Sequence, residues 1–171
     1  MLEYFLDLSG MTMEVPEGTL GRILGGEEDG KRWMREAYGH VELAESAVLS
    51  MLLDRVRFRW EKVVLVSHYD DDLAFAERRR MPIVTFVHRE ISAESIVTAC
   101  EEEGIVIRSG FFLSEGCFKS WKDNWRKQGG GEEVAVRVEK EGAVRVSMAH
   151  YNTEEEVGKL IEVLEKMKGW S

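Results

Sequence analysis

The sequence predicts a small α+β or α/β domain, in which a sheet of short strands is flanked by helices. An apolar stripe at helical spacing runs from Lys31 to Arg57. Three short aliphatic and β-branched runs follow, and the last third of the chain contains alternating valines and a capped helix. A length of 171 residues suits one ordinary domain with one core.

The first helical prediction divides the chain into two parts. Residues Leu2 to Leu8 have helical spacing, but several glycines and Pro16 then interrupt the pattern. We therefore expect an N-terminal helix and flexible connector over 1–30, and a domain over 31–171. The stripe of the long helix is made of Trp33, Ala37, Val41, Ala44, Val48 and Leu52.

The middle of the chain predicts a strand, a helix and another strand. Residues 63–66, 83–87 and 105–107 are β-branched or aliphatic, as in buried strands. Between the last two of these runs, Ser92 is a suitable N-cap and Gly104 a suitable C-terminal stop. Phe118, Trp121 and Trp125 recur at helical spacing and predict a further helix face that packs on the domain.

The last third predicts a hairpin and a helix. The valines at 134, 136 and 138 alternate with polar residues, as do those at 144 and 146, and residues 139–142 have turn composition. Thr153 and Glu156 then have capping-box spacing. The segment Gly129–Gly131 follows no predicted strand and precedes no predicted helix, so it predicts a flexible link and not a phosphate-binding loop.

Charge and cysteine usage exclude several classes of function. A net charge of −9 argues against binding to nucleic acid or an anionic membrane, and the short basic run 78–80 follows acidic residues 70–72. No apolar run is long enough to span a bilayer. Cys100 and Cys117 make no disulfide framework, and the N-terminus lacks the basic start of a signal peptide, so we expect a cytoplasmic protein. His68 and the acidic run lack the ligand spacing of a calcium loop, so no metal site is predicted.

Two segments carry a resemblance to a known family. Residues 104–110 read GIVIRSG, and residues 144–157 read VRVSMAHYNTEEEV. Together they resemble class V aminotransferases, and more narrowly cysteine desulfurases and their relatives, in which a G-I-x-V-R-x-G strand precedes V-R-x-S-L-x-x-Y-N-T-x-E-E-V near the end of the chain. Residues 80–86 resemble the family's R-x-P-x-V-S-F strand. The resemblance implies the small C-terminal domain of a fold type I enzyme that uses pyridoxal 5'-phosphate (PLP).

Arg145 is the first candidate site residue, and Arg108 is the second. An arginine in an apolar strand must either reach solvent or pair with an anion. A guanidinium binds a carboxylate through two parallel hydrogen bonds, and in the resembled family the arginine at the position of Arg145 holds the α-carboxylate of an amino-acid substrate. Arg108 matches the family's strand arginine, for which a structural ion pair and a ligand contact both remain open.

Two departures from the family limit the expected chemistry. Leu113 stands where a desulfurase has its nucleophilic cysteine, and Cys117 lies four residues further on. No His-Lys pair is present to supply the lysine that forms a Schiff base with PLP. His150 follows a strand and precedes a capped helix, which favours a structural role. We therefore expect no catalytic residue, metal ligand or bound cofactor in the chain by itself.

Three interpretations of function follow. The leading one is a truncated or split class V PLP-enzyme homologue that supplies the carboxylate-binding lobe and is catalytic only with a partner chain that carries the large domain. Its rival is a non-catalytic binding or regulatory module that associates with an enzyme or with itself. A fragment of a normal enzyme is the third.

Overall fold

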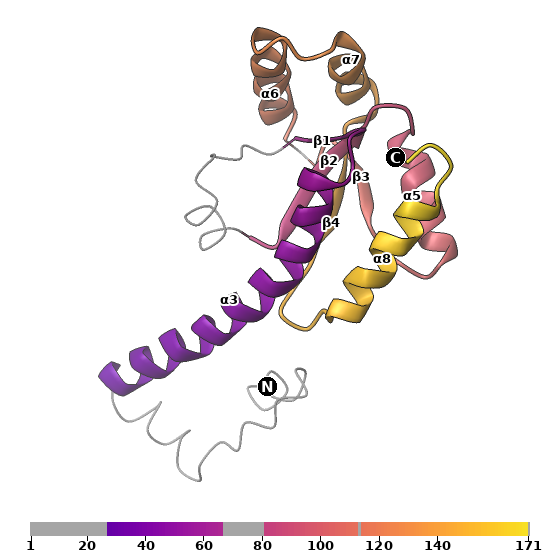
Figure 1. Cartoon of the computed structure of the whole chain (residues 1–171). Helices are drawn as coiled ribbons and strands as arrows, with labels where there is room; N and C mark the ends of the chain where they lie inside the picture. Colours follow the sequence, from indigo (N-terminus) through magenta and orange to yellow (C-terminus); the bar gives the residue numbers. More distant parts are fainter. Residues whose placement is uncertain (1–26, 67–80, 113, 171) are drawn as a thin grey trace.

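The computed structural model describes residues 27–66, 81–112 and 114–170, with side chains from residue 31 onward. The predictions for residues 2–8, for the charged runs near His68 and Arg80, and for Leu113 lie outside these ranges. The described elements, in chain order (Figure 1), are α3 (Glu27–Phe58), β1 (Val63–Leu65), β2 (Ile83–His88), α5 (Ala93–Glu102), β3 (Arg108–Gly110), α6 (Glu115–Lys127), α7 (Glu132–Glu141), β4 (Ala143–Ser147) and α8 (Glu154–Lys166).

The four strands form one sheet in the order β1-β2-β4-β3, and all three neighbouring pairs are antiparallel. The fold is therefore α+β. The strand-helix-strand prediction is confirmed as β2-α5-β3, although β4 lies between its two strands. No helix in the described ranges has the length and apolar composition needed to cross a membrane.

The third strand begins later than the aliphatic run 105–107 that predicted it. Gly104 has φ +76°, and the backbone N–H of Ile105 donates to the carbonyl of Cys100, so this part of the run still closes the end of α5. Pairing with β4 begins at Arg108. The prediction was wrong here because hydropathy does not show where helix termination ends and strand pairing begins.

The caps of α5 and α8 are confirmed. The hydroxyl of Ser92 accepts the backbone N–H of Ser95 at 3.1 Å, which satisfies one free donor of the first turn. At α8, Thr153 accepts the backbone N–H of Glu156, and the Glu156 carboxylate accepts the backbone N–H of Thr153 at 3.0 Å. This carboxylate's pKa is lowered, chiefly by that backbone hydrogen bond and then by the Asn152 amide.

The predicted hairpin over residues 134–146 is wrong in its first half. Residues Glu132–Glu141 form α7, and only the second half, β4, is a strand. Gly131 is the N-cap of α7, so the glycine run does precede a helix, contrary to prediction. Gly142, at φ +73°, ends α7 so close to the carbonyl of Gly110 that a Cβ would clash with that oxygen.

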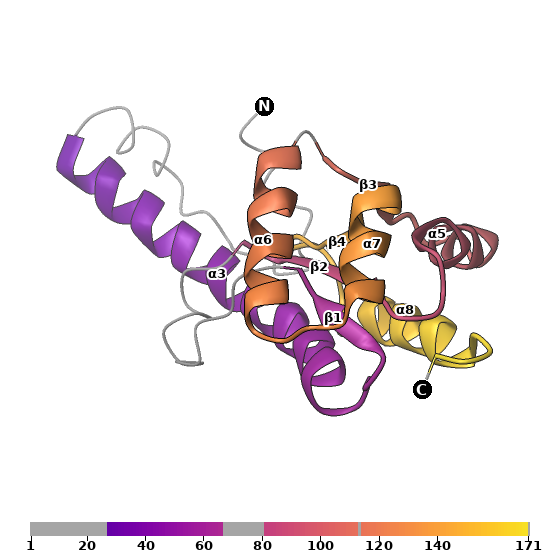
Figure 2. The ribbon, with the colours of Figure 1, turned by 90° about the horizontal axis from the view of Figure 1, so that it is seen from above.

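Each face of the sheet is packed against different helices. Val84, Phe86, Val144 and Val146 belong to a large core with residues of α3, α5 and α8. On the opposite face, a smaller core joins Val64, Val87 and Ala143 to α6 and α7. Phe118 and Trp121 of α6 are buried in this smaller core, as their spacing predicted. Figures 1 and 2 show α6 and α7 side by side at one end of the sheet, apart from α5 and α8.

Candidate functional site

The two candidate arginines lie side by side on the face of the sheet that α6 and α7 partly cover. Strand register places Arg145 of β4 directly opposite Thr85 of β2 on one side and Arg108 of β3 on the other. Directly paired residues of antiparallel strands share a face of the sheet. Thr85, Arg145 and Arg108 therefore form one row across three strands, which we call the arginine row.

The arginine row lies just beyond the small core. Two residues before Arg145 along β4, on the same face and nearer to α6 and α7, Ala143 lies opposite Gly110 and is fully buried. Two residues after Arg145 along β4, Ser147 lies opposite Ile83 and is exposed. The row thus occupies the boundary between the covered and the uncovered halves of this face, with Arg145 half-buried and Arg108 exposed.

The Arg145 guanidinium is held in place by an aromatic ring. Its central carbon lies 4.4 Å from the centroid of the Phe112 ring, which is a cation–π distance. Phe112 has φ +51°, in the left-handed region that non-glycine residues rarely adopt. The Ser114 hydroxyl donates to the carbonyl of Phe111 at 2.8 Å and helps to fix this loop. The loop between β3 and α6 therefore places an aromatic plane over the cation.

Arg145 has hydrogen-bonding capacity that the described residues do not use. Its Nε atom is buried and has no hydrogen-bond partner. No ion pair within the described residues involves Arg145 or Arg108. Like charges directly opposite on a sheet are destabilising, and a buried unpaired donor costs about 1–3 kcal/mol. The arrangement is therefore suited to an anion, and a carboxylate would satisfy the planar fork of the guanidinium.

The arginine row lies outside two grooves of the described surface, and Arg108 in it is exposed. One of two grooves, of about 440 Å³, lies between α6 and α7 and is lined by charged residues that include Lys122 and Glu139. The other, of about 330 Å³, lies between residues 104–107 and α8. Neither groove includes Arg145 or Arg108. A ligand on this row would need another surface to enclose it.

The residues around the row do not fit a PLP site. The four strands contain no lysine for a Schiff base and no carboxylate for the pyridinium nitrogen. The nearby α6 lysine Lys122 is paired with Glu139 at 3.4 Å. The described residues also contain no group of three or more side chains that could hold a metal ion.

No contact within the described residues joins Cys117 or His150 to the arginine row. Cys117 is exposed in the first turn of α6. His150 lies in the connection between β4 and α8, with Nδ1 4.0 Å from the Glu45 carboxylate of α3. In the same connection, the Asn152 side-chain oxygen accepts the backbone N–H of Ala149 at 2.8 Å, which shapes the turn before α8.

Sequence reasoning missed two members of this neighbourhood, Thr85 and Phe112. Thr85 stands between buried Val84 and Phe86, and a polar residue inside an apolar run indicates a strand face that is not fully covered. Phe112 lies in the segment that departs from the desulfurase loop, but its contact with Arg145 depends on the backbone of the loop and has no local signal.

Comparison with solved structures places this fold within larger proteins. The X-ray structure of a NifS-like protein from Rickettsia africae ESF-5 matches 74% of this chain at 18% identity with a TM-score of 0.52. The apo structure of a cysteine desulfurase from Thermococcus onnurineus NA1 matches 81% at 20% identity with a TM-score of 0.49. This chain spans only 28% of the length of each. The first comparison supports the fold: the described domain resembles one part of the fold of the NifS-like protein.

Comparison of sequences gives the family. No curated protein sequence matches the chain significantly. The family model for class V aminotransferases matches residues 65–160, which include both arginines and the segments that carry the resemblance. Because the match covers more than half of the 171 residues, the chain belongs to the class V aminotransferase family.

Proposed function

We propose that this chain supplies the carboxylate-binding lobe of a class V PLP-dependent enzyme and is catalytic only with a partner that carries the cofactor domain. The observation that carries the proposal is Arg145, whose guanidinium is held over Phe112 with a buried donor unused. The absence of a lysine or carboxylate for PLP from the four described strands supports a cofactor domain outside the described residues. Under this proposal, residues 31–171 correspond to the C-terminal domain of the complete enzyme.

Arg145 would bind the carboxylate of an amino-acid substrate through two parallel charge-assisted hydrogen bonds. The Phe112 ring covers one face of the guanidinium, which favours a ligand at the edge of the fork. Arg108 would raise the positive potential at the row, and the Thr85 hydroxyl could accept or donate a further hydrogen bond. The residues of this chain would thus orient the substrate, while the partner would hold PLP and its lysine. We place this complex in the cytoplasm, where both free cysteines would stay reduced.

Carboxylate binding tests Arg145 directly. An amino acid should perturb the NMR signals of the strand residues around Arg145, with a dissociation constant of about 1 mM because neither groove includes the row. Arg145→Ala should weaken binding by roughly tenfold or more, since hydrogen bonds to charged groups contribute about 1.5–3 kcal/mol. Arg145→Lys should recover only part of the loss, because lysine lacks the planar fork.

Two controls separate the carboxylate site from general charge attraction. Arg59→Ala removes an exposed arginine outside the row and should leave binding unchanged. The amide of the same amino acid should not bind. Equal binding by wild type and Arg145→Ala, or equal binding of acid and amide, would remove the proposed role of Arg145.

A second experiment separates the enzyme lobe from a binding module. PLP added to the purified chain should give no saturable Schiff-base absorbance band. A class V large domain supplied as a separate chain should give the band and should bind this chain. A saturable band with this chain alone would refute the requirement for a partner. Failure to combine with any cofactor domain, with carboxylate binding intact, would favour the non-catalytic module.

A further inference from the structure

Arg145 and Arg108 lie directly opposite each other, and neither has a counter-ion among the described residues. The strands β1 to β4 contain no aspartate or glutamate. The carboxylates of α7, which packs on the same face of the sheet, are each paired with a cation outside the row. These pairs are Glu132–Arg126, Glu133–Arg89, Glu139–Lys122 and Glu141–Arg137. Two like charges thus face each other without a described acid to balance them.

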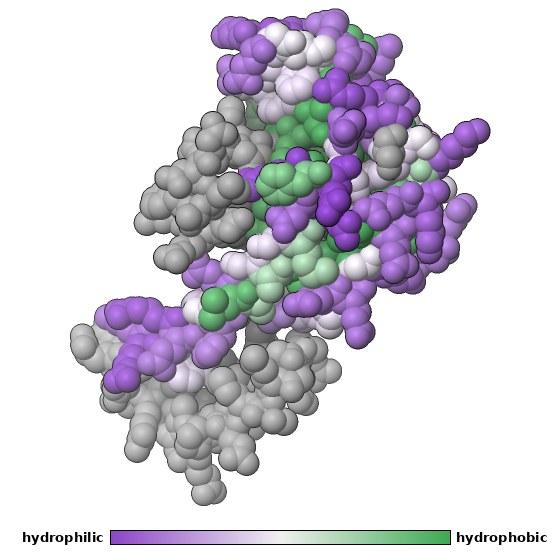
Figure 3. Space-filling model, viewed as in Figure 1, coloured by the Kyte–Doolittle hydropathy of each residue, from purple (hydrophilic) through white to green (hydrophobic). Residues whose placement is uncertain are grey.

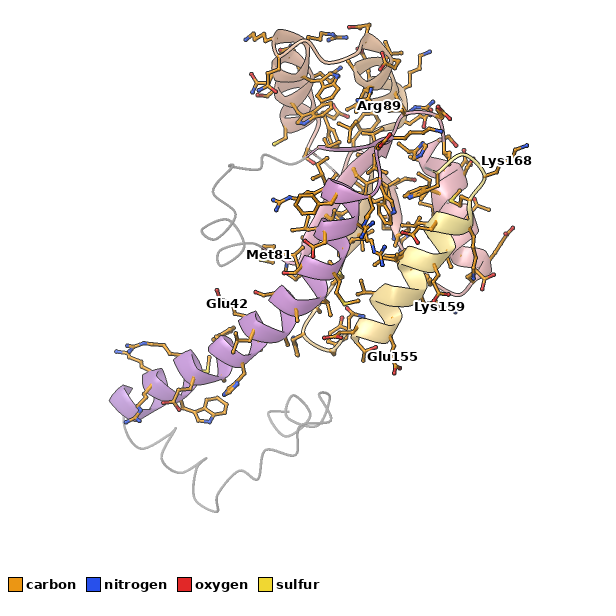
Figure 4. All side chains as sticks on the ribbon, in the orientation of Figure 1. Glu42, Met81, Arg89, Glu155, Lys159 and Lys168 are labelled. Carbon is orange, nitrogen blue, oxygen red and sulfur yellow. The ribbon has the colours of Figure 1, made fainter. Side chains whose placement is uncertain are left out.

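The acidic first turn of α8 does not balance the row either. This helix packs in the large core, on the opposite face of the sheet, and Figure 4 shows Glu155 at the end of α8 that is away from α6 and α7. The Glu156 carboxylate already accepts hydrogen bonds from the Asn152 amide and the Thr153 backbone N–H. The positive charge of the row is therefore left for a ligand.

The two arginines differ in how firmly they are held. Arg145 is half-buried, and the Phe112 ring lies against its guanidinium. Arg108 is exposed on β3, an edge strand of the described sheet. The Cβ atoms of directly opposite residues are about 4.5–5.5 Å apart, so both guanidinium groups can reach one small ligand. Arg145 thus offers a fixed site for an anionic group, and Arg108 an adjustable one beside it.

The rest of the row gives such a ligand a direction. Thr85, on the other side of Arg145, carries no charge, so a second anionic group would meet a cation of the row only on the side of β3. The surface seen in Figure 3 is largely hydrophilic, with apolar residues gathered between α6 and α3. A ligand with one carboxylate would leave Arg108 without a partner.

We propose that the ligand of the arginine row is an acidic amino acid, whose α-carboxylate binds Arg145 and whose side-chain carboxylate binds Arg108. This inference rests on the function proposed for Arg145 and adds the class of substrate. The α-carboxylate is common to all amino acids, so it suits the guanidinium that is held in place. The side-chain carboxylate suits the guanidinium at the sheet edge, which can adjust to the length of the side chain. Binding replaces repulsion between two arginines with two attractive pairs.

Aspartate and asparagine test this inference on the full chain, because they differ only by a carboxylate against an amide in the side chain. Each is titrated while the side-chain Nε–H signals of Arg108 and Arg145 are followed by NMR. Aspartate should bind roughly tenfold more tightly than asparagine at low salt and should shift both signals. Asparagine should shift only the signal of Arg145. Added salt should reduce the difference, because Arg108 is exposed.

Substitutions at Arg108 assign the preference to that side chain. Arg108→Gln keeps a long polar side chain and removes the charge, so it should lower the affinity for aspartate to that for asparagine and leave asparagine binding unchanged. Arg108→Glu places a carboxylate opposite Arg145, and the resulting pair should weaken the binding of both amino acids. Arg59→Ala removes an exposed arginine outside the row and should preserve the preference for aspartate.

The possible outcomes separate this inference from the function on which it rests. Equal affinity for aspartate and asparagine, with both depending on Arg145, would overturn the acidic substrate and leave the role of Arg145 intact. This is the result expected if Arg108 only discourages pairing at the sheet edge. A preference for aspartate that persists in Arg108→Gln would overturn the inference as well. Failure of both amino acids to bind would overturn both proposals.

Discussion

His88 is the buried polar side chain on which the end of the chain is anchored. Its Nδ1 accepts the backbone N–H groups of Glu90 and Ile91 at 3.1 and 3.0 Å, so the ring proton resides on Nε2, which donates to the carbonyl of Trp170 at 3.1 Å. The Trp170 ring lies 4.9 Å from the imidazole, centroid to centroid. Protonation of Nδ1 would replace an acceptor with a donor facing two N–H groups. These hydrogen bonds therefore favour the neutral imidazole.

Stability should fall as the pH falls through the ordinary titration range of histidine. Burial lowers the pKa of His88 below 6.5, outweighing the raising effects of the Trp170 carbonyl and Glu90, while Lys62 and Arg137 lower it further. A lowered folded-state pKa means that the unfolded chain takes up the proton first. The contribution of neutral His88 to the free energy of unfolding is therefore complete above pH 6.5. It is lost as the pH falls toward the pKa of His88 in the folded protein, with a slope of up to about 1.4 kcal/mol per pH unit.

Urea unfolding of wild type and His88→Asn between about pH 7.5 and 5.5 measures this effect. The variant should be less stable at the higher pH but should lose less stability on acidification. His40→Asn, at an exposed position of α3, should keep the wild-type pH dependence. The same slope in His88→Asn and wild type would show that other groups cause the acid sensitivity.

At the scale of elements, α7 shows how a tertiary requirement overrides a local pattern. The valines at 134, 136 and 138 alternate as in a strand, but Val134 and Val138 are also four residues apart and share one face of a helix. That face covers the small core together with α6. An Arg137–Glu141 pair within the helix and an Arg89–Glu133 pair to the end of β2 support this arrangement.

Valine-to-alanine substitutions distinguish the helix from the predicted hairpin. Val138 is fully buried, so Val138→Ala should cost roughly 2 kcal/mol in the free energy of unfolding. Val136 is only partly buried and alanine is the better helix former, so Val136→Ala should change it by less than about 0.5 kcal/mol. Chemical denaturation of both variants measures the difference. Similar large losses for both would indicate a strand, in which the two valines share a buried face.

At the scale of the whole molecule, the large core joins segments that are distant along the chain. Trp170, near the C-terminus, makes edge-to-face contacts with Trp60 at 5.1 Å and with Phe86 at 6.1 Å between ring centroids. Cys100 of α5 is fully buried in the same core. Because the core includes residues of α3, α5 and α8 and one face of the sheet, we expect these elements to unfold together.

Thiol labelling measures this cooperativity. Burial raises the pKa of Cys100 to about 11, and its side chain is inaccessible, whereas Cys117 is exposed. The Cys117 thiol should react rapidly in the native protein, and the Cys100 thiol should react only on unfolding. In Cys117→Ser, labelling of Cys100 against urea should follow the tryptophan-fluorescence transition. Labelling of Cys100 well below that transition would show instead that α5 opens independently.

The sequence by itself determined the elements whose signals are local. The long helix α3, the apolar runs of β1 and β2, and the caps at Ser92 and Thr153 are features of neighbouring residues, and the structure agrees with each. The segments around Arg108 and Arg145 likewise predicted the family, which the match over residues 65–160 shows. Both arginines were named as candidates from these segments alone.

Tertiary structure decided what depends on strand register and on the space left between elements. Residues 132–141 form the helix α7 and not a strand, because the helix buries Val134 and Val138 on the side of the sheet next to α6. Tertiary structure began β3 at Arg108, which brought that side chain directly opposite Arg145 and completed the row with Thr85. It also folded the β3–α6 loop so that Phe112 lies over Arg145. None of these can be obtained from local sequence, because side chains distant along the chain become neighbours only when the sheet has formed.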